Sequence, residues 1–97
     1  MQLLIFHSHI QDEIEESYNW YESKLPGLGE NFLDELENSY SIIQKNPEMY
    51  LKVSGDVRRY LVIKFPFGIL YKVTDENINI VAVMHLKRKP DYWQKRI

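Results

Sequence analysis

The sequence contains no cysteine, which excludes disulfides, thiolate metal ligands and a cysteine nucleophile. Only four glycines and four prolines occur in 97 residues, and there is no repeat or low-complexity segment, so no linker is expected. No apolar run approaches the roughly 20 residues that a transmembrane helix needs. Residues 1–7 lack the basic lead of a signal peptide, so they are interpreted as a strand, and a cytoplasmic location is the default expectation.

Basic residues are scarce in the first half of the chain. Residues 1–48 contain two basic and ten acidic residues, a formal charge of −8. Residues 49–97 contain ten basic and four acidic residues, a formal charge of +6. Such a dipole steers an anionic partner toward one face of a protein. The alternative is two solvated faces of uneven charge that serve solubility.

The length and apolar content predict a single globular domain covering residues 1–97. Hydrophobic residues make up 44% of the chain, enough for one core that needs no disulfide or bound metal to stabilise it. No metal or cofactor is expected, because no motif for either is present.

The N-terminal half predicts a strand followed by two helices. The apolar residues 2–7 are typical of a strand, and Ser8 with Gln11 matches a capping box for a helix over about residues 9–24. A break rich in proline and glycine precedes a second helix over about 28–45. The expected buried stripes of the two helices are Ile10, Ile14, Tyr18, Tyr21 and Leu25, then Leu28, Phe32, Leu36, Tyr40 and Ile43.

The C-terminal half changes to a period of two. Strands are predicted over residues 59–65, 69–73 and 78–85, and the last is apolar enough to be a central strand covered on both faces. Residues 90–97 form a short tail, predicted as about one helical turn. The order β-α-α-β-β-β predicts an α+β fold in which an N-terminal helical hairpin packs on one face of a sheet.

Several segments, in their joint order and spacing, resemble the RelE/ParE toxin superfamily. The similarity covers nearly the whole chain, and no single segment carries it alone. Its pieces are Tyr18-Asn19-Trp20-Tyr21-Glu22, Pro26-Gly27-Leu28-Gly29-Glu30-x-Phe32-Leu33, Asn46-Pro47-Glu48-x-Tyr50, Val57-Arg58-Arg59, Lys64-Phe65-Pro66-Phe67, Tyr71-x-Val73 and Val81-Ala82-Val83-x-His85-x-x-Arg88-x-Pro90-x-x-Trp93.

The resemblance implies a single RelE/ParE-like toxin domain of a type II toxin–antitoxin, or plasmid stabilisation, system. The family fold is a curved antiparallel sheet with a helical hairpin against it. ParE-like members inhibit DNA gyrase by binding, whereas RelE-like members are mRNA interferases that cut mRNA in the ribosome. An antitoxin neutralises both. The Pro90 and Trp93 ending and the mildly acidic pI of about 5.9 favour the ParE-like branch. Lys89 departs from the pattern, which often has aspartate there.

An endoribonuclease would need a base, an acid and cations around the scissile phosphate. His85, Arg88 and Tyr92 are the catalytic candidates under that alternative, with Arg59 and Lys64 as further cations. A histidine that titrates near neutral pH suits either proton-transfer role. The alternative for His85 is a structural histidine at the edge of the sheet. A third functional alternative is an inactive family member that retains antitoxin binding.

The candidate target-binding residues gather in the basic C-terminal half. A cationic run followed by aromatic residues suits RNA binding by stacking or a protein-binding hot spot. For Arg58 and Arg59, phosphate binding and pairing with Glu15 or Glu16 both remain open. Trp93 has a second interpretation, as a hydrophobic clasp folded onto the sheet. The full set is Arg58, Arg59, Lys64, Lys87, Arg88, Lys89, Tyr92 and Trp93.

Antitoxin binding is predicted over the helical hairpin and the sheet, as the resemblance implies. Exposed apolar residues at the edges of the helix stripes would form the groove for an extended or helical partner segment. Trp20 and Ile42 are the candidates. The free form is expected to be a monomer or a weak homodimer.

Overall fold

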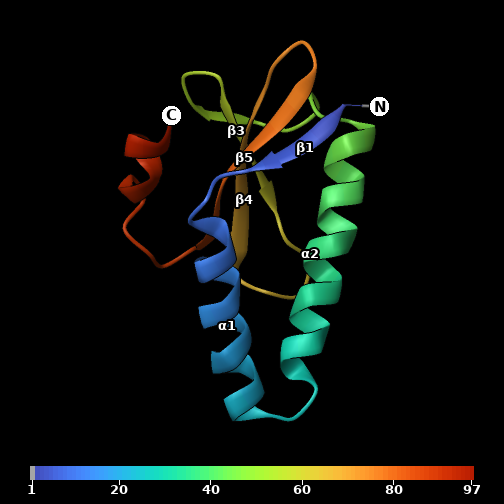
Figure 1. Cartoon of the computed structure of the whole chain (residues 1–97), viewed down its shortest axis with the longest axis vertical. Helices are drawn as coiled ribbons and strands as arrows, with labels where there is room; N and C mark the ends of the chain where they lie inside the picture. The colour runs from blue at the N-terminus through green and yellow to red at the C-terminus, as the bar shows by residue number, and fades with distance from the viewer. Residues whose placement is uncertain (1) are drawn as a thin grey trace.

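The computed structural model describes residues 2–97, so Met1 of the predicted domain lies outside the described residues. Two helices, five strands and a C-terminal 3-10 helix make up the fold (Figure 1). In chain order the elements are β1 (Leu3–Phe6), α1 (Ile10–Lys24), α2 (Leu28–Lys45), β2 (Lys52–Ser54), β3 (Val57–Leu61), β4 (Phe67–Val73), β5 (Asn77–His85) and η1 (Tyr92–Arg96). Among these described residues, no helix combines the length and apolarity needed to cross a membrane.

The two predicted helices are confirmed, and they run side by side as a hairpin (Figure 1). Their close approach requires Gly29, where an added Cβ would lie 2.6 Å from the Glu22 Cγ atom. The Gly29 N–H donates instead to the Glu22 carboxylate at 2.8 Å. Gly27 precedes α2 with a φ of 91°, a left-handed conformation that glycine adopts without strain.

The predicted capping box at Ser8 is wrong. The N-cap of α1 is His9, and it makes no side-chain cap hydrogen bond. Because the helix begins one residue later than expected, the Ser8 hydroxyl lies too far back to reach the first free N–H groups. His7 closes this turn: its Nδ1 atom accepts from the His9 N–H at 3.2 Å, and its carbonyl accepts from the Ile10 N–H at 3.0 Å.

The helix stripes are largely as predicted. Ile10 and Tyr21 of α1 are buried, and so are four of the five predicted α2 positions, Phe32, Leu36, Tyr40 and Ile43. Leu25 is exposed, because it is the C-cap of α1 in an extended conformation and no longer follows the helical period.

The sheet has the order β1-β5-β4-β3-β2. The predicted antiparallel pairing holds for β2 to β5, but β1 pairs with β5 in parallel, so the sheet is mixed. A parallel neighbour requires a long crossover, which the helical hairpin and the following strands supply here. The position of β5 between β1 and β4 confirms the predicted central strand.

The first predicted C-terminal strand is shifted toward the N-terminus. It spans Val57–Leu61 instead of residues 59–65, and the short strand β2 before it was not predicted. The chain reverses early because Lys64 adopts a left-handed conformation with a φ of 73°. The Val62 N–H then donates to the Phe67 carbonyl at 2.9 Å and closes the turn.

Each face of the sheet carries its own apolar cluster. The helix face, against α1 and α2, contains the larger cluster, with Phe32, Tyr71 and Ile80 at its centre. The opposite face, called the tail face below, packs Val57, Leu70, Val81, Ala82 and Met84 against Trp93 of η1. Figure 1 shows the C-terminal segment on one side of the sheet and α2 on the other.

Candidate functional site

The site begins where β5 extends beyond the end of β1, its parallel neighbour. β1 ends at Phe6, and the His7 N–H makes the last contact, with the Ile80 carbonyl at 3.0 Å. Beyond this point two side chains replace the missing strand. Arg96 Nη1 donates to the Val81 carbonyl at 3.1 Å, and the Val83 N–H donates to Glu13 Oε1 at 3.3 Å. The open edge of β5 is therefore satisfied by α1 and η1.

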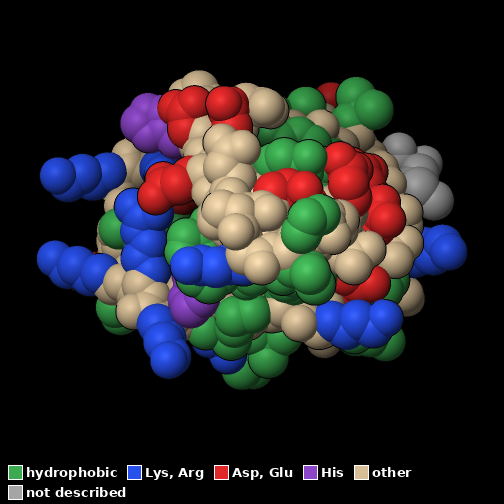
Figure 2. Space-filling model, turned by 90° about the horizontal axis from the view of Figure 1, so that it is seen from below, with side chains coloured by type: hydrophobic (Ala, Val, Ile, Leu, Met, Phe, Trp, Pro, Cys, Tyr) green, Lys and Arg blue, Asp and Glu red, His purple; other side chains and the backbone are tan. Residues whose placement is uncertain are grey.

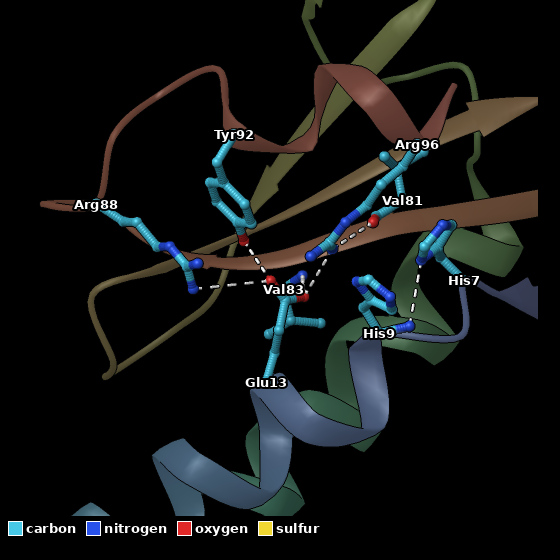
Figure 3. A network of polar contacts seen from close by, with 8 residues as sticks. All are labelled: His7, His9, Glu13, Val81, Val83, Arg88, Tyr92 and Arg96. Carbon is cyan, nitrogen blue, oxygen red and sulfur yellow. Dashed lines mark hydrogen bonds and ion pairs between the residues drawn. The ribbon is translucent and has the colours of Figure 1, made fainter.

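Glu13 is the hub of this network (Figure 3). Its Oε1 atom accepts from Arg96 Nη1 at 3.1 Å, and its Oε2 atom accepts from the Tyr92 hydroxyl at 2.5 Å. Arg88 Nη1 lies 4.0 Å from the same Oε2 atom. The Glu13 side chain is only 8% exposed, and that of Arg96 is 11% exposed. A nearly buried carboxylate thus ties α1 to the C-terminal segment.

The Tyr92 ring contacts the guanidinium groups of two arginines. The Arg88 Cζ atom lies 3.9 Å from the centroid of the Tyr92 ring, and the Arg96 Cζ atom lies 5.1 Å from it. Burial raises the pKa of the Tyr92 hydroxyl well above its ordinary value, and the hydrogen bond to Glu13 raises it further. Arg88 and Arg96 oppose this rise without cancelling it. The hydroxyl therefore stays protonated across the physiological range and acts as a donor.

A cleft of about 570 Å³ lies between α1 and β5 next to this network. Tyr21, Phe67 and Val83 are apolar side chains in its lining, and Glu13, Glu16, His85 and Arg88 are the charged or titratable ones. Trp20 also lines it, and its side chain is 56% exposed. A large, exposed indole beside an apolar cleft is the kind of surface that binds another chain.

The structure partly assembles the predicted catalytic set. His85 and Arg88 line the same cleft, and Tyr92 lies directly under Arg88. His85 Nδ1 accepts from the Lys87 N–H at 3.0 Å, and its ring packs against Phe67 at 5.2 Å. These contacts are consistent with the structural alternative for His85, and its catalytic role stays a prediction.

Glu13 and Arg96, which complete the network, were not predicted. Glu13 is one of several acidic residues near the start of α1, where such residues also favour the helix dipole. Its only distinguishing signal is its position on the side of α1 that faces β5. Arg96 is separated from it by 83 residues, so no local pattern joins the two.

The two arginines of β3 have different environments. Arg58 Nη1 donates to the carbonyls of Glu48 and Tyr50 at 3.0 and 2.7 Å and so holds the segment after α2. This replaces the predicted pairing with Glu15 or Glu16, which lie on α1. The alkyl part of Arg59 lies across Gly68 on the tail face, where an added Cβ would be 3.1 Å from the Arg59 Cδ atom.

The remaining predicted target-binding residues are also separated. Lys64 lies in the turn before β4 and lines a different pocket, beside Asp34 and Glu35 of α2. Lys87 and Lys89 are exposed in the segment after β5. In Figure 2 most of the visible Lys and Arg side chains protrude at the left edge, others lie at the right, and the acidic side chains are spread between them.

Trp93 is the predicted hydrophobic clasp. Its ring is 3% exposed in the tail-face cluster, and its Nε1–H donates to the Pro90 carbonyl at 2.7 Å. The ring is buried against the sheet, and its contact with a target stays a prediction.

The two predicted antitoxin-binding residues do not share one surface. Trp20 lines the cleft between α1 and β5, whereas Ile42 lies on α2, half-buried against the helix-face cluster. Within residues 2–97, no group of three or more histidine, aspartate or glutamate side chains is placed to hold a metal ion.

Comparison with known proteins places this geometry in a family. No curated protein matches the sequence. The chain superposes with a TM-score of 0.79 on a solved chain described as "Chromosomal ParDE TA system from P. aeruginosa", at 14% identity, covering 90% of this chain and 98% of that one. This likeness concerns the fold. The sequence profile of the family described as "ParE toxin of type II toxin-antitoxin system, parDE" matches residues 4–90. The chain therefore belongs to the ParE toxin family of type II toxin–antitoxin systems.

Proposed function

We propose that this toxin acts by binding a target such as DNA gyrase, without chemistry of its own, and that a cognate antitoxin neutralises it. The observation that carries this proposal is the Glu13 network. The tyrosine that an RNA-cutting mechanism would use is already hydrogen-bonded to a nearly buried carboxylate.

Metal-independent RNA cleavage needs one group to accept the 2′-hydroxyl proton and another to protonate the leaving oxygen. The Tyr92 hydroxyl is a poor candidate for either role, because burial and Glu13 raise its pKa and its proton is held in the hydrogen bond to the Glu13 carboxylate. Glu13 also lines the cleft with His85 and Arg88, and its carboxylate would repel a phosphate bound there. His85 is then the only titratable catalytic candidate left, and one group does not complete the reaction.

The cleft between α1 and β5 supports antitoxin binding. The apolar part of its lining and the exposed Trp20 ring suit the apolar face of a partner segment. We infer that the antitoxin's C-terminal segment occupies this cleft.

The mode of action is tested by two assays on one preparation. The purified toxin is added to gyrase in a supercoiling assay and to translating ribosomes in an mRNA cleavage assay. The proposal expects loss of supercoiling and intact mRNA. Cleaved mRNA, with a loss of cleavage of orders of magnitude in both His85→Ala and Arg88→Ala, would establish the endoribonuclease alternative. No effect in either assay would favour an inactive member.

Antitoxin placement is tested by binding the antitoxin encoded beside the toxin gene. Trp20→Ala should weaken the complex by about 2 kcal/mol, or about 30-fold, as expected for an interface tryptophan. Leu25→Ala is the matched control, because Leu25 is also exposed near the end of α1 but does not line the cleft. Equal affinities of the two variants would contradict the placement.

A further inference from the structure

The tail face of the sheet is only partly covered by the C-terminal segment. Trp93 packs over Val57, Leu70, Val81, Ala82 and Met84. Beyond this cluster the same face continues with Arg59 and Leu61 of β3, Gly68 of β4 and Leu86 after β5. These four residues are called the Arg59 patch below. They lie together, because Leu61 is the register partner of Gly68 and the side chains of Arg59 and Leu86 both approach the Gly68 position.

The patch holds one arginine in a defined position. An added Cβ at Gly68 would lie 3.1 and 3.2 Å from the Arg59 Cδ and Cγ atoms and 3.6 Å from a Leu86 methyl group. The absence of a side chain at Gly68 therefore lets the Arg59 alkyl chain lie flat on the sheet. Within residues 2–97 the Arg59 guanidinium takes part in no ion pair and no side-chain hydrogen bond, unlike that of Arg58. Its donors remain available to a partner.

The charge around the patch is predominantly positive. None of the five strands contains an aspartate or glutamate. Ten of the 14 acidic residues lie in residues 1–48, and most of these are on the helices of the other face. Lys87 follows Leu86 directly and is exposed. The tail face therefore presents a positive potential that complements an acidic surface.

The composition of the patch indicates the class of partner. Leu61 is 51% exposed and Leu86 is 45% exposed on either side of the guanidinium. One arginine between two exposed leucines suits a protein interface, where an arginine anchor sits among apolar contacts. A nucleic-acid surface would require several phosphate-binding cations or aromatic rings for stacking, and the patch has neither.

We propose that the Arg59 patch is the surface with which this toxin contacts an acidic region of its protein target, and that Gly68 is the positioning residue for Arg59. The proposal rests on the proposed function as a toxin that acts by binding. It places target contact on the tail face, on the opposite side of the sheet from the helical hairpin, so that target and antitoxin engage different surfaces.

The first test compares Arg59→Glu with Lys45→Glu for binding to the intact gyrase tetramer. Both substitutions change the charge by two units, but Lys45 lies at the end of α2 on the helix face. Arg59→Glu should weaken binding at least about tenfold, since it places a like charge against the acidic target. Lys45→Glu should stay within about twofold. Binding that Arg59→Glu leaves unchanged would overturn the patch while the proposed function stands.

The second test separates positioning from folding by a double-mutant cycle. Gly68→Ala should weaken binding a few-fold in the wild-type background and have no further effect in the Arg59→Ala background. Equal losses in both backgrounds would show that Gly68 acts through the fold, and the positioning role would be overturned. Thermal unfolding of each variant verifies that it is folded.

Two controls separate the failure of this proposal from failure of the proposed function. If the wild type arrests bacterial growth on induction but does not bind gyrase, the same variants are compared by growth arrest, and relief by Arg59→Glu alone supports the patch on another target. If the wild type neither arrests growth nor binds gyrase, both proposals are overturned. Binding of the wild type to a DNA duplex that Arg59→Glu abolishes would overturn a protein partner in favour of a nucleic acid.

Discussion

The most informative perturbation of this fold is Glu13→Gln. The substitution keeps the shape of the side chain and removes its charge. Three donors converge on the wild-type carboxylate, from Val83, Tyr92 and Arg96. A glutamine offers one carbonyl oxygen and an amide group that is itself a donor, so it cannot accept from all three groups, and its amide would face either Tyr92 or the Val83 and Arg96 donors.

The expected cost follows from burial. The Glu13 and Arg96 side chains are both about nine-tenths buried, and removing one partner of a buried ion pair costs about 3–5 kcal/mol. Arg88 is partly exposed and can reorient, which favours the lower end of that range. We expect a loss of about 3 kcal/mol. At about 4–8 °C per kcal/mol for a domain of this size, Tm should fall by about 12–24 °C.

Glu16→Gln is the matched control. It makes the same chemical change one turn further along α1, and Glu16 forms no ion pair among the described residues. It should change the free energy of unfolding by less than about 0.5 kcal/mol. Urea unfolding measures both variants, and emission from Trp93 in a Trp20→Phe background reports whether the clasp opens. Equal stability of the two variants would refute the reasoning that Glu13 anchors the C-terminal segment.

Three further outcomes are expected. Gly29→Ala should destabilise the hairpin by about 1–3 kcal/mol in urea unfolding, because its Cβ would overlap the Tyr18 ring at 2.9 Å, and an unchanged midpoint would contradict this close approach. Tyr40→Phe should leave stability unchanged or raise it by about 1 kcal/mol in thermal unfolding, since its buried hydroxyl has no partner among the described residues; a large loss would indicate a hidden hydrogen bond. Above pH 10 the protein should lose stability progressively, because burial raises the pKa of Tyr71 to about 12 and that of Tyr92 still higher, so the folded state retains protons that the unfolded state releases. Unfolding measured from pH 8 to 11 tests this, and Tyr92→Phe should flatten the dependence.

The sequence predicted those parts of the fold that local periodicity determines. Both helices followed from apolar spacing, and β5 followed from an apolar run too long for a strand with a solvated face. The parallel pairing of β1 could not be predicted, because an apolar strand of four residues has the same pattern in either direction. The end of β3 was misplaced because residues 62–65 look like strand, whereas the left-handed Lys64 ends it.

The site was less predictable than the fold. Arg88 and Tyr92 were identified from the composition of the basic tail, and Trp93 was foreseen as a clasp. Glu13 was not identified, because its role depends on a contact across 79 residues with Tyr92 and on a strand edge that exists only once β1 ends. Long-range partnerships of this kind have no signature in a single sequence.

The parallel pairing of β1 with β5 also constrains when the toxin can form. The first strand to leave the ribosome has its partner 74 residues later, at Asn77 for Leu3, so the sheet cannot close during synthesis of the first three quarters of the chain. The helical hairpin has local contacts and can form early. The partners of Glu13 and the remaining parts of the two apolar clusters come from β5 and η1, which are synthesised last. A chain that stops before residue 77 lacks its central strand, the Trp93 clasp and the whole basic tail, so it cannot complete the fold.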